Sequence, residues 1–446
     1  MPLSIMTRVI IYAFGVLILG YPRSHFAEPP PSLSYTDALS AAHENSPDVR
    51  IATEDLNIAE AEKAKSDSFV PQAPSIEASV TRGTSKDSIE ALDYNYTAQT
   101  NGQKLPMKGW EVGISQKFEI AGERGLRQEE MGARKRYFEA RLSSQQLQSR
   151  AQARELYLQA SLLQEWEQHL SEHLVRFYRL QARFGGGYID RRLGSYSLVA
   201  LNMGIQTLKS ERDEVRTLKE KLMRELSILV GQPSATLKLD AIDSIKMPDL
   251  PPLEELRTAM EENGVLLKEK RAFLESRVKA ADLESRKLWP APSLFLYGGE
   301  RTLNSGAQIT VSPANRETYM RAGIQLPLAF LGPERQNSTI ERQKAEKARV
   351  ELEAETSKSA LQLEASYRNY ESFRAQYLQM HNFLIRAERF FPALEQALMG
   401  RRITYFEFWG EHERYHALFQ KSLDVRLNAA RALSELELLT GRVLEK

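Results

Sequence analysis

The sequence contains no cysteine among its 446 residues. Disulfide bonds, thiolate metal sites and a lipid-modified N-terminal cysteine are therefore excluded. An excess of charge is missing as well, because 60 lysines and arginines balance 59 acidic residues. Binding to nucleic acid through net charge is not expected. Beyond the N-terminal segment, the chain also lacks an apolar run that would form a transmembrane helix.

One short apolar run does occur near the N-terminus. Arg8 is followed by Val9–Gly20, a run of about a dozen residues that is too short to span a bilayer but suits a signal peptide. Small residues follow and end at Ala27. We therefore predict a Sec-type signal peptide over residues 1–27, with a buried strand or a membrane anchor as the alternative.

The rest of the chain contains an internal repeat. "HENSPDVR" at His43–Arg50 aligns with "EENGVLLK" at Glu261–Lys268. Further matches follow in the same order: Pro71–Ala78 with Trp289–Leu296, Gly113-Ile114 with Gly323-Ile324, Gly122 with Gly332, Tyr157 with Tyr367, and Glu225–Gln232 with Glu435–Arg442. A period this long indicates two copies of a whole structural unit. We predict a first repeat over residues 28–232, a linker over 233–252, a second repeat over 253–442 and a tail over 443–446.

Each repeat has the same predicted order of elements. A first helix, about Tyr35–Phe69 or Leu253–Leu288, is stopped by prolines. Two strands joined by a polar loop follow and end at a glycine. A helix of about sixty residues, a glycine break and a return helix of about forty residues complete the repeat.

The long helices carry apolar residues at seven-residue spacing. One series is Leu156, Leu163, Leu170, Phe177 and Phe184, and the other is Leu363, Tyr370, Tyr377, Leu384, Phe391 and Leu398. Four or more heptads indicate coiled-coil packing. Sixty helical residues would extend on the order of 90 Å.

Trp110–Ile120 and Tyr319–Leu328 alternate between apolar and polar residues, as barrel strands do. The predicted lipid-facing residues are Trp110, Val112, Ile114, Phe118, Ile120, Met320, Ile324, Leu326 and Leu328. A soluble sheet with one wet face is the alternative. Because four strands cannot close a barrel, a barrel would need strands from further copies of the chain, two copies giving eight and three giving twelve.

The repeated "AHENSPDV" and "AMEENGVL" helix openings, the strand exits "FEIAGERG" and "LAFLGPER", and the endings "ELSILVG" and "ELELLTG" resemble those of the TolC-like outer-membrane efflux channel family. Within the family, the segment pattern resembles the heavy-metal, CzcC-like branch. The resemblance implies a mainly α-helical fold with a small β part, in which a homotrimer forms a 12-stranded transmembrane β-barrel and a coiled-coil α-helical tunnel. It places the protein in the outer membrane of a Gram-negative cell, with a periplasmic extension.

The same resemblance implies a conduit and not an enzyme, without a cofactor. Its partners would be outer-membrane lipid, a periplasmic adaptor protein and an inner-membrane pump of the RND type. The adaptor would dock where the long helices turn back, at Gly186, Gly187, Tyr188, Ile189, Asp190, Gly400, Arg401, Arg402 and Ile403. A plain turn between helices is the alternative.

Relatives narrow the tunnel with aspartates that this sequence lacks at the matching positions. The acids nearest to these positions are Glu407 and Glu411, and Asp190 lies in the turn of the first repeat. Three copies of any one of these acids would form a ring that favours cations. Arg401 and Arg402 would pair with an acidic adaptor surface or with Glu407.

Two histidine patterns remain. "HERYH" at His412–His416 satisfies the H-E-x-x-H pattern of zinc peptidases, with Glu413 as the base and Glu435 or Glu437 as a third ligand. A coiled-coil wall offers no substrate cleft, and the first repeat lacks the pattern, so we do not predict an enzyme.

His169 and His173 also stand four residues apart. His173 and His416 lie at similar distances from their turns, which makes them weak metal-ligand candidates if their side chains meet. Solvated surface histidines are the favoured interpretation, so we predict no metal site.

The sequence thus favours the exit duct of a tripartite system that exports metal ions or small toxic compounds. One alternative is the exit duct of a type I protein secretion system. Another, from a different class, is a periplasmic coiled-coil scaffold or adaptor without a barrel.

Overall fold

The computed structural model describes residues 32–68, 72–85, 105–120, 122–185, 191–232, 238–240, 247–303 and 315–444. The predicted signal peptide lies outside these ranges. The chain divides into two compact units. Unit 1 comprises Met1–Pro47, Ser149–Met247 and Phe373–Arg431, and unit 2 comprises Asp48–Gln148, Pro248–Ser372 and Ala432–Lys446. Each unit therefore takes segments from both halves of the sequence.

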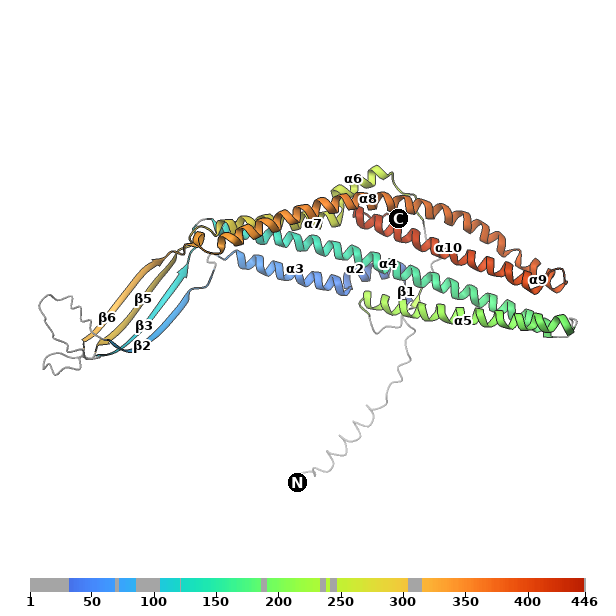
Figure 1. Cartoon of the computed structure of the whole chain (residues 1–446), viewed down its shortest axis with the longest axis horizontal. Coiled ribbons are helices and arrows are strands. Elements are labelled where there is room, and N and C mark those ends of the chain that lie inside the picture. Colours follow the sequence, from blue (N-terminus) through green and yellow to red (C-terminus); the bar gives the residue numbers. More distant parts are fainter. Residues whose placement is uncertain are drawn as a thin grey trace, which may run out of the picture. The chain divides into compact units, whose positions relative to one another are not determined.

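Unit 2 contains a four-stranded antiparallel sheet in the order β2-β3-β5-β6 (Figure 1). The strands are β2 (Ser75–Ser85), β3 (Leu105–Lys117), β5 (Ser293–Leu303) and β6 (Asn315–Gln325). The pairing of β3 with β5 places Ile114 opposite Leu296 and joins the two halves of the sequence. The predicted fold class, mainly helical with a small antiparallel β part, is confirmed.

One face of this sheet is apolar and exposed in the single chain. Its exposed residues include Ile76, Val80, Trp110, Val112, Ile114, Leu294, Leu296, Met320 and Ile324. Phe118, Ile120, Leu326 and Leu328 were also predicted on the strands, but they follow the strand ends. The backbone N–H of Phe118 takes no part in strand pairing and donates to the Pro292 carbonyl at 2.9 Å. Pro327 comes two residues after β6 and has no N–H to extend that strand.

The opposite face of this sheet explains why a glycine precedes an isoleucine in both β3 (Gly113-Ile114) and β6 (Gly323-Ile324). At Gly113, a Cβ would lie 2.0 Å from the ring of Tyr297, the residue directly opposite on β5. At Gly323, a Cβ would lie 2.4 Å from the ring of Phe295, also directly opposite. The Tyr297 hydroxyl donates to Glu77 at 2.8 Å, which holds its ring across β3. Both glycines therefore give room to aromatic rings from β5.

The first helix of each half is broken, although a single helix was predicted. The pieces are α2 (Tyr35–Asn45), α3 (Pro47–Ser66), α6 (Leu253–Asn263) and α7 (Val265–Arg286). Ser46 is extended, with φ −59° and ψ 147°, because the residue before a proline is pushed out of the helical region. Gly264 breaks the second pair, and a Cβ there would lie 2.4 Å from the Met260 carbonyl oxygen.

The long helices match the predicted pattern. They are α4 (Glu123–Gly185), α5 (Arg191–Leu229), α8 (Glu334–Glu388) and α10 (Tyr405–Thr440), with 63, 39, 55 and 36 residues. An unpredicted break separates α8 from α9 (Phe391–Met399), which starts with a proline in its first turn. Within the described part of the chain, no helix is both long and apolar enough to cross a membrane.

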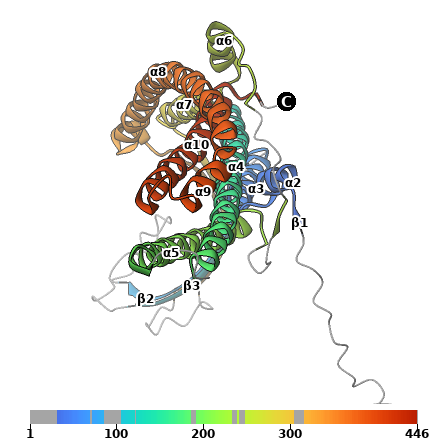
Figure 2. The ribbon, with the colours of Figure 1, turned by 90° about the vertical axis from the view of Figure 1, so that its right-hand side faces the viewer.

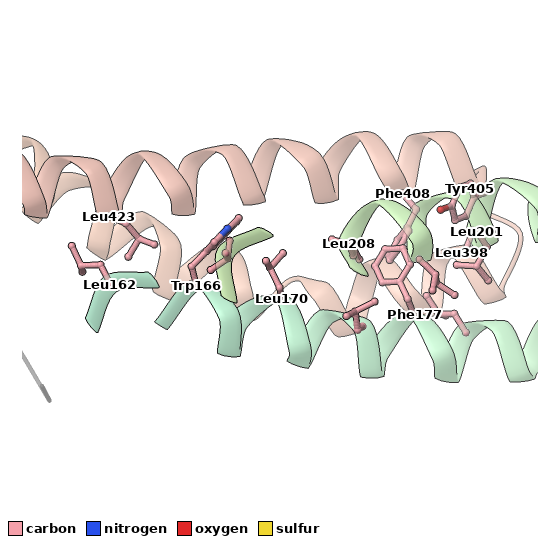
Figure 3. Close-up of a cluster of buried hydrophobic side chains, with 14 residues drawn as sticks. Leu162, Trp166, Leu170, Phe177, Leu201, Leu208, Leu398, Tyr405, Phe408 and Leu423 are labelled. Atoms are coloured by element: carbon pink, nitrogen blue, oxygen red, sulfur yellow. The ribbon is translucent and has the colours of Figure 1, made fainter. Parts of the chain in front are cut away.

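The heptad positions supply much of the core. Leu170, Phe177, Leu363, Tyr370, Leu384, Phe391 and Leu398 are buried. In unit 1, α4 packs against α5 and α10 around one apolar cluster (Figure 2). Figure 3 shows Leu162 opposite Leu423, and Phe177 beside Phe408 with ring centroids 5.9 Å apart. Helices α4 and α10 therefore run antiparallel, so that residues later in one face residues earlier in the other.

Two buried tyrosines anchor the extended segments that precede the first helices. The Tyr157 hydroxyl donates to the Leu33 carbonyl at 2.9 Å, in the strand β1 (Ser32–Leu33) that pairs in parallel with β4 (Lys238–Leu239). In unit 2, the Tyr370 hydroxyl donates to the Pro248 carbonyl at 2.7 Å. The sequence alignment pairs Tyr157 with Tyr367, but Tyr370 makes the corresponding contact one helical turn later.

Replacing Tyr370 with phenylalanine should lower the free energy of unfolding by about 1–2 kcal/mol, because the partly buried Pro248 carbonyl loses its donor. Tyr367→Phe is the matched control and should have little effect. Urea unfolding followed by circular dichroism measures both. Equal losses for the two variants would contradict the assignment of Tyr370.

Gly113→Ala should destabilise the sheet by about 1–3 kcal/mol, because the added methyl group overlaps the Tyr297 ring. Gly298→Ala is the control, since nothing lies within 4 Å of a Cβ there. The thermal midpoint of the purified protein reports the effect. The same midpoint for both variants would show that the ring moves aside without cost.

Candidate functional site

The two predicted docking turns differ in what can be described. Helix α4 ends at Gly185 and α5 begins at Arg191. Gly186, Gly187, Tyr188, Ile189 and Asp190 lie outside the described residues, so their predicted roles remain predictions. The second turn, between Met399 and Tyr405, is described in full.

The second turn is a Schellman motif built around an arginine. The Arg402 N–H donates to the Ala397 carbonyl and the Arg401 N–H to the Leu398 carbonyl, at 2.8 and 3.1 Å. The residue in the left-handed region is Arg401, with φ 57°. Gly400 has φ −78° and ψ 4°. The expectation that Gly400 supplies the turning conformation is therefore wrong, because the left-handed position falls one residue later.

The exposed groups at this turn are charged. Arg401 and Arg402 are exposed, and neither forms an ion pair within the described ranges. Ile403 is partly buried and packs against the apolar cluster of unit 1. The exposed apolar residue is Phe406, which is 68% exposed. Ile403 therefore anchors the turn, and Phe406 presents an apolar ring to solvent.

The two acids after this turn have local partners. Glu407 accepts from the Thr404 backbone N–H at 2.7 Å, and the Glu407 N–H donates to the Thr404 hydroxyl at 3.2 Å. This reciprocal pair is a capping box at the start of α10. The Thr404 N–H holds the pKa of Glu407 below its ordinary value. Glu407 thus caps a helix and does not pair with the arginines, and Glu411 pairs with Arg414 at 2.6 Å.

The histidines of α4 and α10 form a buried cluster. His173 Nδ1 lies 2.7 Å from His412 Nε2, and His416 Nε2 lies 3.0 Å from the same His412 nitrogen. The His169 ring centroid is 4.3 Å from that of His173 and 4.7 Å from that of His416. Each of these four histidines is at most 8% exposed.

The expectation of solvated surface histidines is therefore wrong for these four. His173 and His416 do meet, as their role as candidate ligands required, with ring centroids 4.6 Å apart. His169 and His412 join them, although the sequence argument considered His412 only within the rejected peptidase pattern and gave His169 no ligand role. The available signal was the repeated four-residue spacing, which places each pair on one face of its helix.

Aromatic residues enclose the cluster on both sides along the helices. Phe419 stacks on His169, with ring centroids 4.1 Å apart. It also stacks on Trp166, with ring centroids 5.5 Å apart. On the other side, Phe177 lies 4.7 Å from His412. The facing pairs thus run Trp166 with Phe419, His169 with His416, His173 with His412, and Phe177 with Phe408.

This environment keeps the imidazoles neutral. Burial lowers the pKa of His169 to about 3 and that of His416 to about 4. Burial also lowers the pKa of His173 and His412, and neighbouring histidines lower both further because two imidazolium charges would repel each other. The nearby guanidinium of Arg176 acts in the same direction on these two and on His169.

The peptidase pattern does not assemble a catalytic group. Glu413, the expected base, accepts a hydrogen bond from the Trp409 indole at 2.6 Å. The proposed third ligands both belong to unit 2. Glu435 accepts from the Ser366 hydroxyl and Glu437 from the Leu444 N–H, each at 2.6 Å. The histidines of the motif meet His169 and His173 instead of either glutamate.

No protein-family profile matches the sequence, and no curated protein sequence matches it. Solved structures do match, at low identity. CusC, described in terms of transmembrane channel formation, matches with a TM-score of 0.69 and 14% identity over 94% of this chain and 95% of that chain. The outer-membrane channel OprN gives 0.69 and 13% over 91% and 89%. The CmeC outer membrane channel of Campylobacter jejuni gives 0.68 and 14% over 95% and 92%.

These matches confirm the resemblance to TolC-like outer-membrane channels, whereas the CzcC-like branch stays a prediction. At such identities they show the fold, which is that of outer-membrane channels. The chain covers nearly the whole length of each of these structures, so the likeness includes both the strands and the long helices.

Acidification should destabilise the helices around the histidine cluster. Because the folded pKa values lie below the unfolded value of about 6.5, the unfolded chain binds protons first as pH falls. The free energy of unfolding should therefore be highest above about pH 6.5 and fall between there and about pH 3, by at most about 1.4 kcal/mol per pH unit for each histidine.

Urea unfolding with a chelator present, at about pH 7 and about pH 5, measures this slope. Replacing His169 and His416 with phenylalanine keeps an aromatic ring at each position and should reduce the slope. An unchanged slope in this double variant would contradict the assignment.

Proposed function

We propose that the protein is the outer-membrane exit duct of a tripartite efflux system and conducts substrates passively. The observation that carries the proposal is the four-stranded sheet with an exposed apolar face, in a chain that has the fold of outer-membrane channels. A soluble sheet would bury that face against another layer. Lipid is the natural partner for a sheet that is apolar on its outer face.

The sheet also supports assembly into a homotrimer. Within the described part of the chain, β2 and β6 each pair on one side only. Their outer edges leave backbone N–H and C=O groups without strand partners, which a membrane does not tolerate. Three copies joined edge to edge would close a twelve-stranded barrel, and the predicted signal peptide over residues 1–27 would deliver the chain to the outer membrane.

The exposed turn after α9 is the proposed contact for a periplasmic adaptor. Arg401 and Arg402 expose positive charge at this turn, and Phe406, four residues after Arg402, exposes its ring. An adaptor surface that combines acidic side chains with an apolar patch would complement them. We propose residues 186–190, which lie between α4 and α5 in the sequence, as the second contact.

The adaptor would connect the duct to an inner-membrane pump, and we propose an RND-type pump that exports metal ions or small toxic compounds. Cargo would be chosen largely by the pump. The duct itself supplies a conduit and no chemistry, in keeping with the local roles of Glu407 and Glu413.

Cell fractionation followed by unheated and heated gels tests the proposal. The protein should be found in the outer-membrane fraction as a trimer that heating dissociates. A soluble periplasmic monomer would overturn the duct and favour a scaffold without a barrel.

Two neighbouring residues of β2 sharpen this test. Val80→Arg places a charge on the apolar face and should reduce the membrane-inserted trimer strongly, because a cation facing lipid costs about 2–4 kcal/mol near the bilayer midplane. Ser79→Arg places the same charge on the polar face, opposite Glu111, and should assemble normally. Equal assembly of both variants would contradict a lipid-facing sheet.

A further inference from the structure

We propose that His169, His173, His412 and His416 form a binding site for a divalent transition-metal ion, with Zn²⁺ as the best-fitting ion. The site goes beyond the conduit function and does not depend on it. It lies wholly within unit 1, where it would tie α4 to α10.

The first argument is convergence. Ligand nitrogens of His169, His173 and His416 all lie within 4.8 Å of one another. His412 Nε2 lies 2.7 Å from a His173 nitrogen and 3.0 Å from a His416 nitrogen. Tetrahedral zinc with Zn–N bonds of about 2.0–2.1 Å separates its ligand nitrogens by about 3.4 Å. The two separations from His412 are slightly shorter than this value, and the other three nitrogens lie within a 4.8 Å limit of one another, so modest side-chain rotations would form the site.

The second argument is incomplete hydrogen bonding. A neutral imidazole nitrogen carries either one proton or one lone pair. His412 Nε2 therefore cannot make a full hydrogen bond to both His173 and His416. In addition, His169 Nε2 and His416 Nδ1 are buried without a hydrogen-bond partner in the described part of the chain. A buried nitrogen without a hydrogen-bond partner lowers the stability of the fold. A metal ion would bind to the nitrogen lone pairs that accept no hydrogen bond.

The donor set selects the class of metal. Four neutral imidazoles favour zinc, copper or nickel over magnesium and calcium, which prefer oxygen ligands. The enclosing rings of Trp166, Phe177 and Phe419 limit access of water. Arg176 would repel a cation, but its guanidinium is paired with Glu388 at 3.4 Å, which offsets part of that charge.

The site is structural in character. Two ligands come from one turn of α4 and two from one turn of α10, so one ion would connect antiparallel helices that are far apart in sequence. Because Glu413 accepts a hydrogen bond from the Trp409 indole, it is not held ready to activate a metal-bound water. We therefore expect the ion to fix the two helices relative to each other and to perform no hydrolysis.

Zinc binding to the full-length protein tests the proposal. The protein is purified through a tag that contains no histidine, treated with a chelator, and titrated with Zn²⁺ by calorimetry. We expect one ion per chain and a higher thermal midpoint in its presence. Titration with Co²⁺ should give the visible absorption of a tetrahedral site. Absence of saturable zinc binding, or of the cobalt spectrum, would overturn the proposal.

Matched variants locate the ion. His169→Phe and His173→Phe each remove a ligand but keep an aromatic ring among aromatic neighbours, and each should weaken zinc binding at least about tenfold, since even the loss of an outer-shell partner costs about 10–100-fold. His381→Phe, at an exposed position of α8, is the control and should bind as the unaltered protein does.

Circular dichroism confirms that each variant is helical before binding is measured. Unaltered zinc affinity in the helical α4 variants would show that the four histidines serve only as a neutral aromatic core. Weakened binding in His381→Phe alone would assign the ion to the surface, and it too would overturn the proposal.

Discussion

The antiparallel register between α4 and α10 is the constraint on which unit 1 depends. It places Phe177 beside Phe408, and it brings the two histidine pairs together within the same row of contacts. A shift of one residue in either helix would turn these side chains onto different faces. The same register fixes where α10 must begin, and so where the turn after α9 lies.

In unit 2 the corresponding role belongs to β5. This strand pairs with β3 from the first half of the sequence and with β6 from its own half. Its Tyr297 and Phe295 rings occupy the spaces above Gly113 and Gly323. Backbone pairing and side-chain packing therefore act on the same strand, and together they hold the four strands in one sheet.

Local patterns were sufficient to predict much of this fold. Heptad spacing gave the long helices, and alternation gave the strands, because both periods are set by backbone geometry alone. The short breaks at Ser46 and Gly264 were missed, since a single extended residue hardly disturbs a helical pattern over thirty residues. The choice of Tyr370 over Tyr367 was missed because both align plausibly and only packing distinguishes them.

The candidate sites show the same limit. Spacing revealed that the histidines lie in pairs, but burial depends on contacts between residues 239 positions apart, such as His173 and His412. The role of Glu407 was visible in principle, because Thr404 stands three residues earlier as in a capping box. The left-handed conformation of Arg401 was not, since it follows from how α9 ends and from no sequence preference of arginine.

That conformation has a consequence for recognition. An L-residue in the left-handed region gives up roughly 1–2 kcal/mol, and the Schellman hydrogen bonds compensate by locking the backbone around it. The Arg401 side chain therefore projects from a rigid backbone. The conformational entropy of that backbone has already been lost when the chain folds. A carboxylate that binds there has only side-chain rotamers left to immobilise. The turn therefore presents a positive charge on a preorganised backbone and not on a flexible one.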